Sequence, residues 1–485
     1  MNEPVWKKGE RYEGTVTEVR FPNKGIVRVD GISGHCVVKN TLPGQKVAFS
    51  VSKRRSANAE GRLLEIIERA PEEMESDCVH FADCGGCMYR TLPYECQLAL
   101  KEKQVHELLK DYADESCFCP ILASPVTEGY RNKMEFSFGD GYKGGPLELG
   151  LHKMGSFYDI LSVPSCRIVD EDFRTILSES LEFFRAQQIP FYHKIRHEGV
   201  LRHLLVRKAA KTGEILIDLV TNGPLGTGSV VHNYVNLLTG LRLSGKIVGV
   251  LHTQNDALSD TIRDDGTEIL LGRDHFYEEL LGLKFRITPF SFFQTNSFSA
   301  EVLYDTVREM ISRTGMINNS VIYDLYSGTG TIAQLLAPVA KKVIGVEIVE
   351  EAVMAAKENV ELNGLHNCEF IAGDVLKVLD EIENKPDMIV LDPPRDGIHP
   401  KALPKILAYQ VPQIIYISCK PTSLARDLPS FLDAGYRVKE IRPIDQFPAT
   451  GHVEVCCLLE RLRSAKDHIV ISIDADDYYR IKDNK

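Results

Sequence analysis

The sequence predicts a multidomain fold in which a small all-β module comes first, a mixed α+β region follows, and an α/β domain completes the chain. Short segments of alternating polarity, separated by turn residues, fill residues 1–70. Strand-like and helix-like segments are mixed over residues 71–290. Over residues 291–463, apolar strands that end in Asp or Glu alternate with helical stretches, which is typical of a parallel sheet. Residues 464–485 form an acidic tail to which we assign no role.

Length and composition agree with this division. The chain has 485 residues, which corresponds to about three domains. Its 44% hydrophobic and 26% charged residues exclude a disordered, collagen-like or coiled-coil protein. No apolar run approaches the ~18 residues that cross a bilayer, and the first ten residues lack the apolar core of a signal peptide. We therefore expect a soluble, cytoplasmic monomer with no membrane partner.

The N-terminal module is predicted to be a five-stranded, OB-like β-barrel, an architecture that commonly binds oligonucleotides. Residues 12–19 and 25–29 read as strands, with turns at 22–25 and 43–44. The net charge of the whole chain, −11, argues against a nucleic-acid partner. However, residues 1–70 carry 13 Lys and Arg against 8 Asp and Glu, with the densest basic group at 53–55. This local excess favours RNA binding, although three adjacent charges alone would indicate only a solvated loop.

Three cysteines lie close together in the sequence Cys78-x₅-Cys84-Gly-Gly-Cys87. In a cytosolic chain such a group binds metal or does chemistry more often than it forms disulfides. Four thiolates suit either zinc or an iron–sulfur cluster, and the spacing does not decide between them. The candidates for a fourth ligand are Cys96, the Cys117 and Cys119 pair, and Cys166.

A nucleotide-type cofactor site is predicted from four successive strands. The strand that begins at Val321 runs into the turn Gly328-Thr-Gly330, which also fits a dinucleotide-binding fingerprint. The second strand ends at Glu347, 17 residues after Gly330, where a carboxylate can accept hydrogen bonds from both ribose hydroxyls. The third and fourth strands end at Asp374 and Asp392, and two prolines follow Asp392.

This series resembles the class I S-adenosylmethionine-dependent methyltransferases, which have a Rossmann-like fold. Their pattern is D-x-x-x-G-x-G, an acidic residue ending the second strand, and then D-P-P. A nicotinamide-dependent enzyme is the alternative, but it offers no reason for Asp392-Pro-Pro at the end of the fourth strand.

A nucleophile and a base are predicted further along the chain. The strand 413–419 ends in Cys419, at the sheet edge where open α/β sheets bind ligands. Glu454 lies in the apolar run 453–459, where poor hydration would raise its pKa and suit it to be a general base. The simpler readings are a buried small hydrophobe for Cys419 and an outward-facing strand residue for Glu454.

A thiol beside a base suits methylation of a pyrimidine carbon. Carbon 5 of uracil is a poor nucleophile until a thiolate adds to carbon 6, and a base must then remove the proton from carbon 5. Methylation of an exocyclic amine needs no thiol.

Four motifs together resemble those of the RNA (uracil-5-)-methyltransferase family: Ser-Cys419, Asp392-Pro-Pro-Arg-Asp-Gly397, Thr450-Gly-His-Val-Glu454 and Phe290-Ser-Phe-Phe-Gln-Thr-Asn296. The resemblance implies that Cys419 is the nucleophile and Glu454 the base. It also implies that Phe292 lies near the space that a flipped-out base vacates. The residues that it implies contact S-adenosylmethionine are Gln294, Tyr326, Glu347 and Asp392, and Asp374 is expected near the same edge.

The resemblance also bears on the cysteines and the substrate. Some members that methylate 23S ribosomal RNA carry C-x₅-C-G-G-C, a remote cysteine in a Pro-x-Cys context, and a [4Fe–4S] cluster. Pro164-Ser-Cys166 matches that context, so the implied ligands are Cys78, Cys84, Cys87 and Cys166, with zinc as the alternative metal. The N-terminal module resembles the RNA-binding TRAM domain. The expected substrate is a uridine of 23S rRNA; the alternatives are a tRNA T-loop uridine, a non-catalytic RNA-binding assembly factor, and a redox protein.

Overall fold

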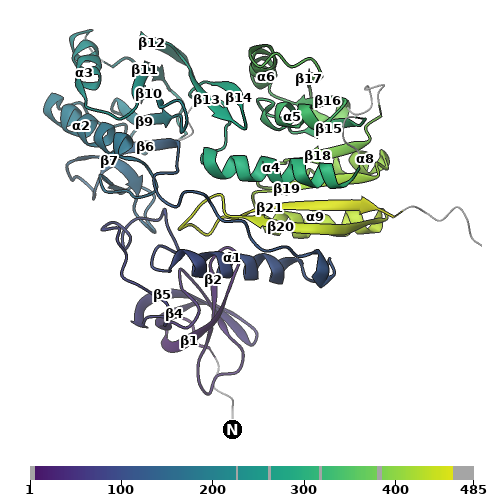
Figure 1. The fold of residues 1–485 in the computed structure, drawn as a ribbon. Helices are drawn as coiled ribbons and strands as arrows, with labels where there is room; N and C mark the ends of the chain where they lie inside the picture. Colours follow the sequence, from purple (N-terminus) through teal and green to yellow (C-terminus); the bar gives the residue numbers. More distant parts are fainter. Residues whose placement is uncertain (1–5, 226–227, 260–263, 316–318, 379–384, 463–485) are drawn as a thin grey trace, which may run out of the picture.

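The computed structural model describes residues 6–225, 228–259, 264–315, 319–378 and 385–462. The expected acidic tail, 464–485, lies outside the described residues. The chain begins with a closed barrel whose strands follow the order β1-β2-β3-β5-β4 (Figure 1). Buried Trp6, Val27, Val38 and Phe49 fill the barrel. The predicted five-stranded barrel is confirmed, and its strands are β1 (Arg11–Arg20), β2 (Lys24–Arg28), β3 (Cys36–Lys39), β4 (Lys46–Arg55) and β5 (Asn58–Glu68).

The central sheet contains seven described strands in the order β12-β11-β10-β9-β6-β7-β8. Helices α2 (Glu171–Gln187) and α3 (Gly228–Gly240) share one buried apolar cluster with it. Only β10 and β11, which flank α3 in the chain, pair in parallel among these described strands. The strands are β6 (Lys133–Asp140), β7 (Leu147–His152), β8 (Ile160–Leu161), β9 (Leu201–Lys208), β10 (Glu214–Thr221), β11 (Lys246–Gln254) and β12 (Gly266–Gly272).

The C-terminal sheet follows the order β17-β16-β15-β18-β19-β21-β20. Its first five strands are parallel, and β21 runs antiparallel between β19 and β20. The strands are β15 (Val321–Leu325), β16 (Lys342–Glu347), β17 (Cys368–Ala372), β18 (Met388–Leu391), β19 (Gln413–Ser418), β20 (Tyr436–Ile444) and β21 (Glu454–Arg461). The sequence analysis anticipated these strands except β20.

Helices cover both faces of this sheet because successive strand residues point to opposite sides. Ile415 and Ile417 of β19 belong to one buried cluster, and Ile414 and Tyr416 belong to the other. The first cluster includes α4 (Ser297–Arg313), α5 (Thr331–Leu336), α6 (Glu350–Leu362) and the hairpin of β13 (Phe276–Leu280) and β14 (Leu283–Ile287). The second includes α7 (Val375–Val378), α8 (Leu403–Ala408), α9 (Pro421–Asp433) and α1 (Tyr94–Leu109).

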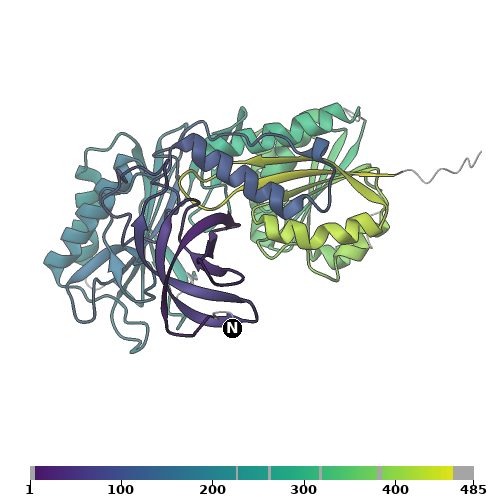
Figure 2. The ribbon, with the colours of Figure 1, turned by 90° about the horizontal axis from the view of Figure 1, so that it is seen from below.

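Helix α1 lies between the barrel and the C-terminal sheet in Figure 1, and in the view from below it crosses the strands of that sheet (Figure 2). Val105 and Leu109 belong to the buried cluster on the α9 side of that sheet. After the 3-10 turn η1 (Glu115–Cys117), Phe118 and Leu122 form isolated bridges to β20. Residues 94–122, which lie within the expected central domain 71–290, therefore contact the C-terminal sheet. No helix in the described part of the chain is long and apolar enough to cross a membrane.

Candidate functional site

The glycine turn lies where the strand order reverses, since β16 and β18 flank β15 on opposite sides. Ligands of open α/β sheets bind at this point, outside the carboxyl ends of the strands. Gly328 and Gly330 have φ of 53° and 74°, the left-handed region that glycine adopts without strain. A Cβ atom on Gly330 would lie 2.4 Å from Cζ of Phe370, so no larger residue fits there.

Glu347, at the end of β16, holds the glycine turn. Its Oε2 accepts a hydrogen bond from the Gly328 N–H at 2.9 Å, and its Oε1 accepts bonds from the N–H groups of Ile348 and Val349 at 2.9 and 3.0 Å. These bonds fix the carboxylate beside the turn, where it can face a ribose. Asp374 follows the neighbouring strand β17 at the same edge.

Tyr326 follows β15 and is held in the left-handed region, with φ of 68°. A non-glycine residue is uncommon there, and such strain concentrates at functional sites. Burial raises the pKa of the Tyr326 hydroxyl to about 12, and the Asp374 carboxylate adds to the effect. Tyr326 and Asp374 therefore interact at the edge where Glu347 lies.

Asp324 was given no separate role in the sequence analysis, although it is the first residue of the D-x-x-x-G-x-G pattern. It is fully buried in β15, and its Oδ2 accepts a hydrogen bond from the Ala333 N–H of α5 at 2.9 Å. Its Oδ1 has no hydrogen-bond partner among the described residues. Burial, together with the nearby Asp392 carboxylate, raises the pKa of Asp324.

Cys419 and Glu454 are brought together by the pairing of β19 with β21. Ser418 pairs with Val455 in this antiparallel ladder. Cys419 directly follows Ser418, Glu454 directly precedes Val455, and the Glu454 carboxylate acts on the Cys419 thiol, so the two side chains lie near each other. The sequence placed Cys419 and Glu454 on separate strands, but only the sheet order makes those strands neighbours.

Burial and like charge shift the pKa of both groups upward. Burial raises the pKa of Glu454 to about 8, and the nearby Asp392 carboxylate adds to the shift while Arg395 opposes it. Burial also raises the pKa of the Cys419 thiol to about 12, helped by the carboxylates of Glu454 and Asp392. Asp392, directly after β18, has its own pKa raised to about 7 by burial. The three groups thus form one electrostatically coupled set.

Arg395 and His452, which the sequence analysis did not single out, border this set. Arg395 Nη2 lies 3.0 Å from His452 Nδ1. Burial lowers the pKa of His452 to about 4, and the neighbouring cations Arg395, Lys101 and Arg131 act in the same direction. The imidazole is therefore neutral at pH 7 and can accept a hydrogen bond from the guanidinium.

The segment 288–296 carries Phe292 and Gln294 to the glycine turn. Thr329 Oγ1 donates a hydrogen bond to the Phe292 carbonyl at 3.4 Å, and the Phe292 side chain is 67% exposed. Gln294 is buried and hydrogen-bonded to the buried hydroxyl of Tyr304 on α4. The carboxylates of Asp392 and Glu454 also act on Tyr304 and raise the pKa of its hydroxyl, so this hydroxyl interacts with both Gln294 and the two carboxylates.

Two central-domain residues that the sequence analysis missed hold the same segment. The Asn132 side chain donates to the Gln294 carbonyl and to Ser297 Oγ, both at 2.9 Å. The buried Arg207 guanidinium donates to the backbone carbonyls of Thr288, Pro289 and Ser291. Neither contact has a local sequence signal, because donor and acceptor are 81 or more residues apart.

The four cysteines predicted as metal ligands line one pocket, which also contains His80, Arg90 and Arg167. Burial raises the pKa of the Cys87 thiol to about 12, with the Cys166, Cys84 and Cys78 sulfurs adding to the shift. Cys96, Cys117 and Cys119 do not line this pocket. The lining cysteines are Cys78, Cys84, Cys87 and Cys166.

The pocket has the side chains of a thiolate site, but these side chains do not have the geometry of metal coordination. Backbone N–H groups point at two of the sulfurs: Gly86 N–H donates to Cys84 Sγ at 3.4 Å, and those of Ile168 and Val169 donate to Cys166. The Nε2 of His80 is buried with no hydrogen-bond partner among the described residues. However, no group of three or more His, Cys, Asp or Glu side chains in the described ranges is placed to hold a metal ion.

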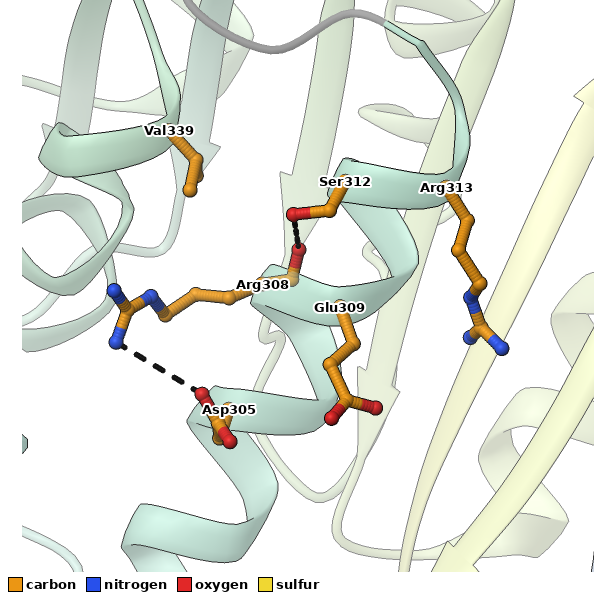
Figure 3. A pocket seen from close by; sticks show the side chains of 6 residues that line it. All are labelled: Asp305, Arg308, Glu309, Ser312, Arg313 and Val339. Carbon is orange, nitrogen blue, oxygen red and sulfur yellow. Dashed lines mark hydrogen bonds and ion pairs between the residues drawn. The ribbon is translucent and has the colours of Figure 1, made fainter.

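A separate hollow lies on the outer surface of α4 (Figure 3). Its charges are partly paired, with Arg308 3.9 Å from Asp305 and the Ser312 hydroxyl donating to the Arg308 carbonyl at 2.8 Å. None of the predicted site residues lines it, so we do not include it in the candidate site. Its lining residues are Asp305, Arg308, Glu309, Ser312, Arg313 and Val339.

Comparisons with known proteins agree with this geometry. The model of the protein family described as tRNA (Uracil-5-)-methyltransferase matches residues 246–462. An RNA methyltransferase of Caldanaerobacter subterraneus is 49% identical over 94% of this chain and 99% of its own, and one of Clostridium tetani is 46% identical over 94% and 98%. The crystal structure of Pyrococcus abyssi tRNA (uracil-54, C5)-methyltransferase in complex with S-adenosyl-L-homocysteine superposes with a TM-score of 0.71. It is 25% identical and covers 92% of this chain and 100% of its own.

The fold and the strand-end site define a Rossmann-like methyltransferase. Since similar RNA methyltransferases extend over nearly the whole chain, its family can also be stated. The chain belongs to the RNA (uracil-5-)-methyltransferase family, as the motifs around Cys419 and Glu454 indicated.

The raised pKa of Glu454 predicts a pH dependence of stability. Between the unfolded value, about 4.3, and the folded value, about 8, the folded protein holds a proton that the unfolded chain has lost. The free energy of unfolding should therefore fall as pH rises through this window, by up to about 1.4 kcal/mol per pH unit. Glu454→Gln should flatten this decline in urea unfolding followed between pH 5 and 8.

Glu460→Gln, a change on the same strand outside the buried set, is the matched control and should keep the wild-type slope. Asp392 contributes in the same direction in all three proteins. An unchanged slope in Glu454→Gln would contradict the assignment of the raised pKa to Glu454.

Proposed function

We propose that the protein methylates carbon 5 of a specific uridine in 23S rRNA, with S-adenosylmethionine as the methyl donor. The observation that carries the proposal is the pairing that sets Cys419 beside the buried Glu454, at the sheet edge that also holds the glycine turn. A thiol and a base so placed suit carbon methylation of uracil.

In the proposed reaction, the Cys419 thiol first loses its proton to solvent, and the thiolate then adds to carbon 6 of the flipped-out uracil and makes carbon 5 nucleophilic. S-adenosylmethionine, when bound, supplies the methyl group for carbon 5 and a positive charge beside the carboxylates. The Glu454 carboxylate then takes the proton from carbon 5. The bond between carbon 6 and sulfur breaks, which restores the ring double bond and frees the enzyme.

The residues proposed to hold S-adenosylmethionine fit an adenosine-containing ligand. The glycine turn brings backbone close to a bound group, and Glu347 is fixed beside it to accept ribose hydroxyls. Buried Gln294 and half-buried Asp392 both interact with the Tyr304 hydroxyl. The proposed contacts are Gln294, Tyr326, Glu347, Asp374 and Asp392.

We also propose that Cys78, Cys84, Cys87 and Cys166 hold a [4Fe–4S] cluster, with zinc as the alternative. Their shared pocket and the N–H groups directed at Cys84 and Cys166 support this donor set, because hydrogen bonds to sulfur stabilise thiolate ligands. The methyl transfer requires no redox step, so the cluster's proposed role is to cross-link the segment that carries it.

The ribosomal substrate is supported by the cysteine set and the basic barrel, which the family resemblance associates with 23S rRNA. A tRNA uridine is the second candidate, because the Pyrococcus protein, which covers 92% of this chain, is a tRNA (uracil-54, C5)-methyltransferase. Both substrates demand the same chemistry from Cys419 and Glu454.

The covalent step predicts a trapped adduct. RNA that carries 5-fluorouridine at the target position should form a stable protein–RNA adduct in the presence of S-adenosylmethionine, since Glu454 cannot remove fluorine as a proton. Denaturing gels should show the shifted band for the wild type and for Cys456→Ala, a buried cysteine of β21. Cys419→Ala should show no band; a band there would disprove the assigned nucleophile.

The cysteine assignment predicts a metal content. Protein purified without oxygen should contain about four iron and four sulfide per chain, measured by colorimetric assay. Cys166→Ser should lower both, whereas Cys96→Ser should leave them unchanged. Zinc in place of iron would establish the alternative metal, and equal iron in Cys166→Ser and the wild type would contradict the ligand set.

The substrate can be identified by mass spectrometry of 5-methyluridine. A strain that lacks the protein should lose 5-methyluridine from 23S rRNA and keep it in tRNA, and expression of the wild type but not Cys419→Ala should restore it. Loss from tRNA alone would replace the ribosomal substrate with the tRNA one.

A further inference from the structure

We propose that three exposed aromatic side chains of the central domain, Tyr142, Phe157 and Tyr158, form a platform on which bases of a single-stranded segment of the substrate RNA stack. We call these three residues the aromatic platform. The proposal rests on the proposed function, since it concerns how the same enzyme holds RNA away from Cys419.

The platform residues are exposed although large aromatic side chains are normally buried. Tyr142, Phe157 and Tyr158 are 65%, 63% and 51% exposed. Among the described residues the other exposed aromatic side chains are Phe290 and Phe292, on the segment 288–296 that carries Gln294. Exposed rings therefore gather at two places, the site and the platform.

The rings of Phe157 and Tyr158 contact neighbouring groups. The ring centroids of Phe157 and Tyr158 are 5.2 Å apart with planes at 86°, and His152 lies parallel to Phe157 at 6.1 Å. The Lys153 ammonium donates to the Gly141 carbonyl at 2.9 Å, which ties the loop of Tyr142 to the loop of Phe157. Ordered rings of this kind bind bases without a large entropy cost.

Charge at the platform suits a nucleic acid. The Lys194 ammonium lies 4.9 Å from the centre of the Phe157 ring. Three further cations lie close in sequence to Tyr142, Phe157 and Lys194: Lys143, Lys153 and Arg196. The acidic residues of these three segments are Asp140, Asp159 and Glu198. This local balance is positive in a chain whose net charge is −11. Rings interleaved with cations are the usual surface for single-stranded nucleic acid.

The platform is also continuous with the basic barrel. The Asn40 side chain, which follows strand β3, contacts Met154 Sδ at 3.6 Å. Exposed Lys24 and Lys39 pair across β2 and β3 just before it. An RNA strand that follows the barrel surface past Asn40 would therefore reach the loop that carries Phe157.

Residues 83–89, which include Cys84 and Cys87, join the platform to the loop that precedes Glu454. On one side Cys84 forms an isolated bridge with Lys153, and the Met154 N–H donates to the Asp83 carbonyl at 2.8 Å. On the other side the N–H groups of Met88 and Tyr89 both donate to the Ala449 carbonyl, at 2.8 and 2.9 Å. Ala449 lies five residues before Glu454, so one short segment positions both the platform and the base.

The test is a comparison of variants with intact protein and substrate RNA. The double variant Phe157→Leu with Tyr158→Leu keeps apolar bulk but removes the rings, and should raise the KM for RNA by about tenfold or more. The kcat and the affinity for S-adenosylhomocysteine should stay at wild-type values. Phe157→Trp with Tyr158→Phe should restore the wild-type KM, and Met354→Ala, an exposed change on α6, is the control.

A direct measurement separates this proposal from the proposed reaction. A single-stranded oligoribonucleotide containing 2-aminopurine should lose fluorescence on binding to Cys419→Ala, and the double leucine variant in that background should abolish the quenching. Unchanged KM and unchanged quenching in the leucine variants would overturn the platform even if the methyl transfer is confirmed. Quenching by the rings without any 5-methyluridine product would instead support the platform and reject the reaction.

Discussion

The buried ion pair between Lys101 and Asp445 is the interaction on which the rest of the structure depends. The Lys101 ammonium lies 2.6 Å from Asp445 Oδ1, and neither side chain is exposed. The same ammonium donates to the Phe447 carbonyl at 3.0 Å, and Asp445 accepts from the Phe447 N–H at 3.2 Å. Removing either partner would leave a lone buried charge, which costs about 3–5 kcal/mol. The pair therefore fixes α1 to the loop that leads to Glu454.

Hydrogen bonds from other parts of the chain converge on the same loop. The Asn296 side chain donates to the Gln446 carbonyl at 2.9 Å, and the Gln446 side chain donates to the Asn296 carbonyl at 3.1 Å. Asn132 binds the neighbouring Gln294 carbonyl from the central domain. The segment around Gln294 and the loop before Glu454 thus hold each other in register, which keeps the proposed base and the proposed cofactor contact at constant separation.

Some of the acidic residues of the chain are concentrated in the interior of this site. Asp324, Asp392 and Glu454 are close enough to raise one another's pKa or that of Cys419, so a positive charge that enters the site would be stabilised there. Arg395 borders these carboxylates, whereas other basic residues are exposed on the barrel and beside the aromatic platform. Separation of the two charges lets one molecule attract a polyanion at its surface and keep carboxylates in its interior.

The sequence by itself determined the local elements, because strands and glycine turns follow from side-chain alternation and backbone freedom within a few residues. It indicated the barrel, the strand ends that carry Glu347 and Asp392, and the separate strands of Cys419 and Glu454. Only the tertiary structure decided that β19 and β21 are neighbours, that α1 packs on the C-terminal sheet, and that Cys166 shares a pocket with Cys87. The hydrogen bonds from the side chains of Asn132, Arg207 and Lys101 also could not be predicted from the sequence. They join residues 81 to 344 positions apart, and such contacts leave no periodic pattern along the chain.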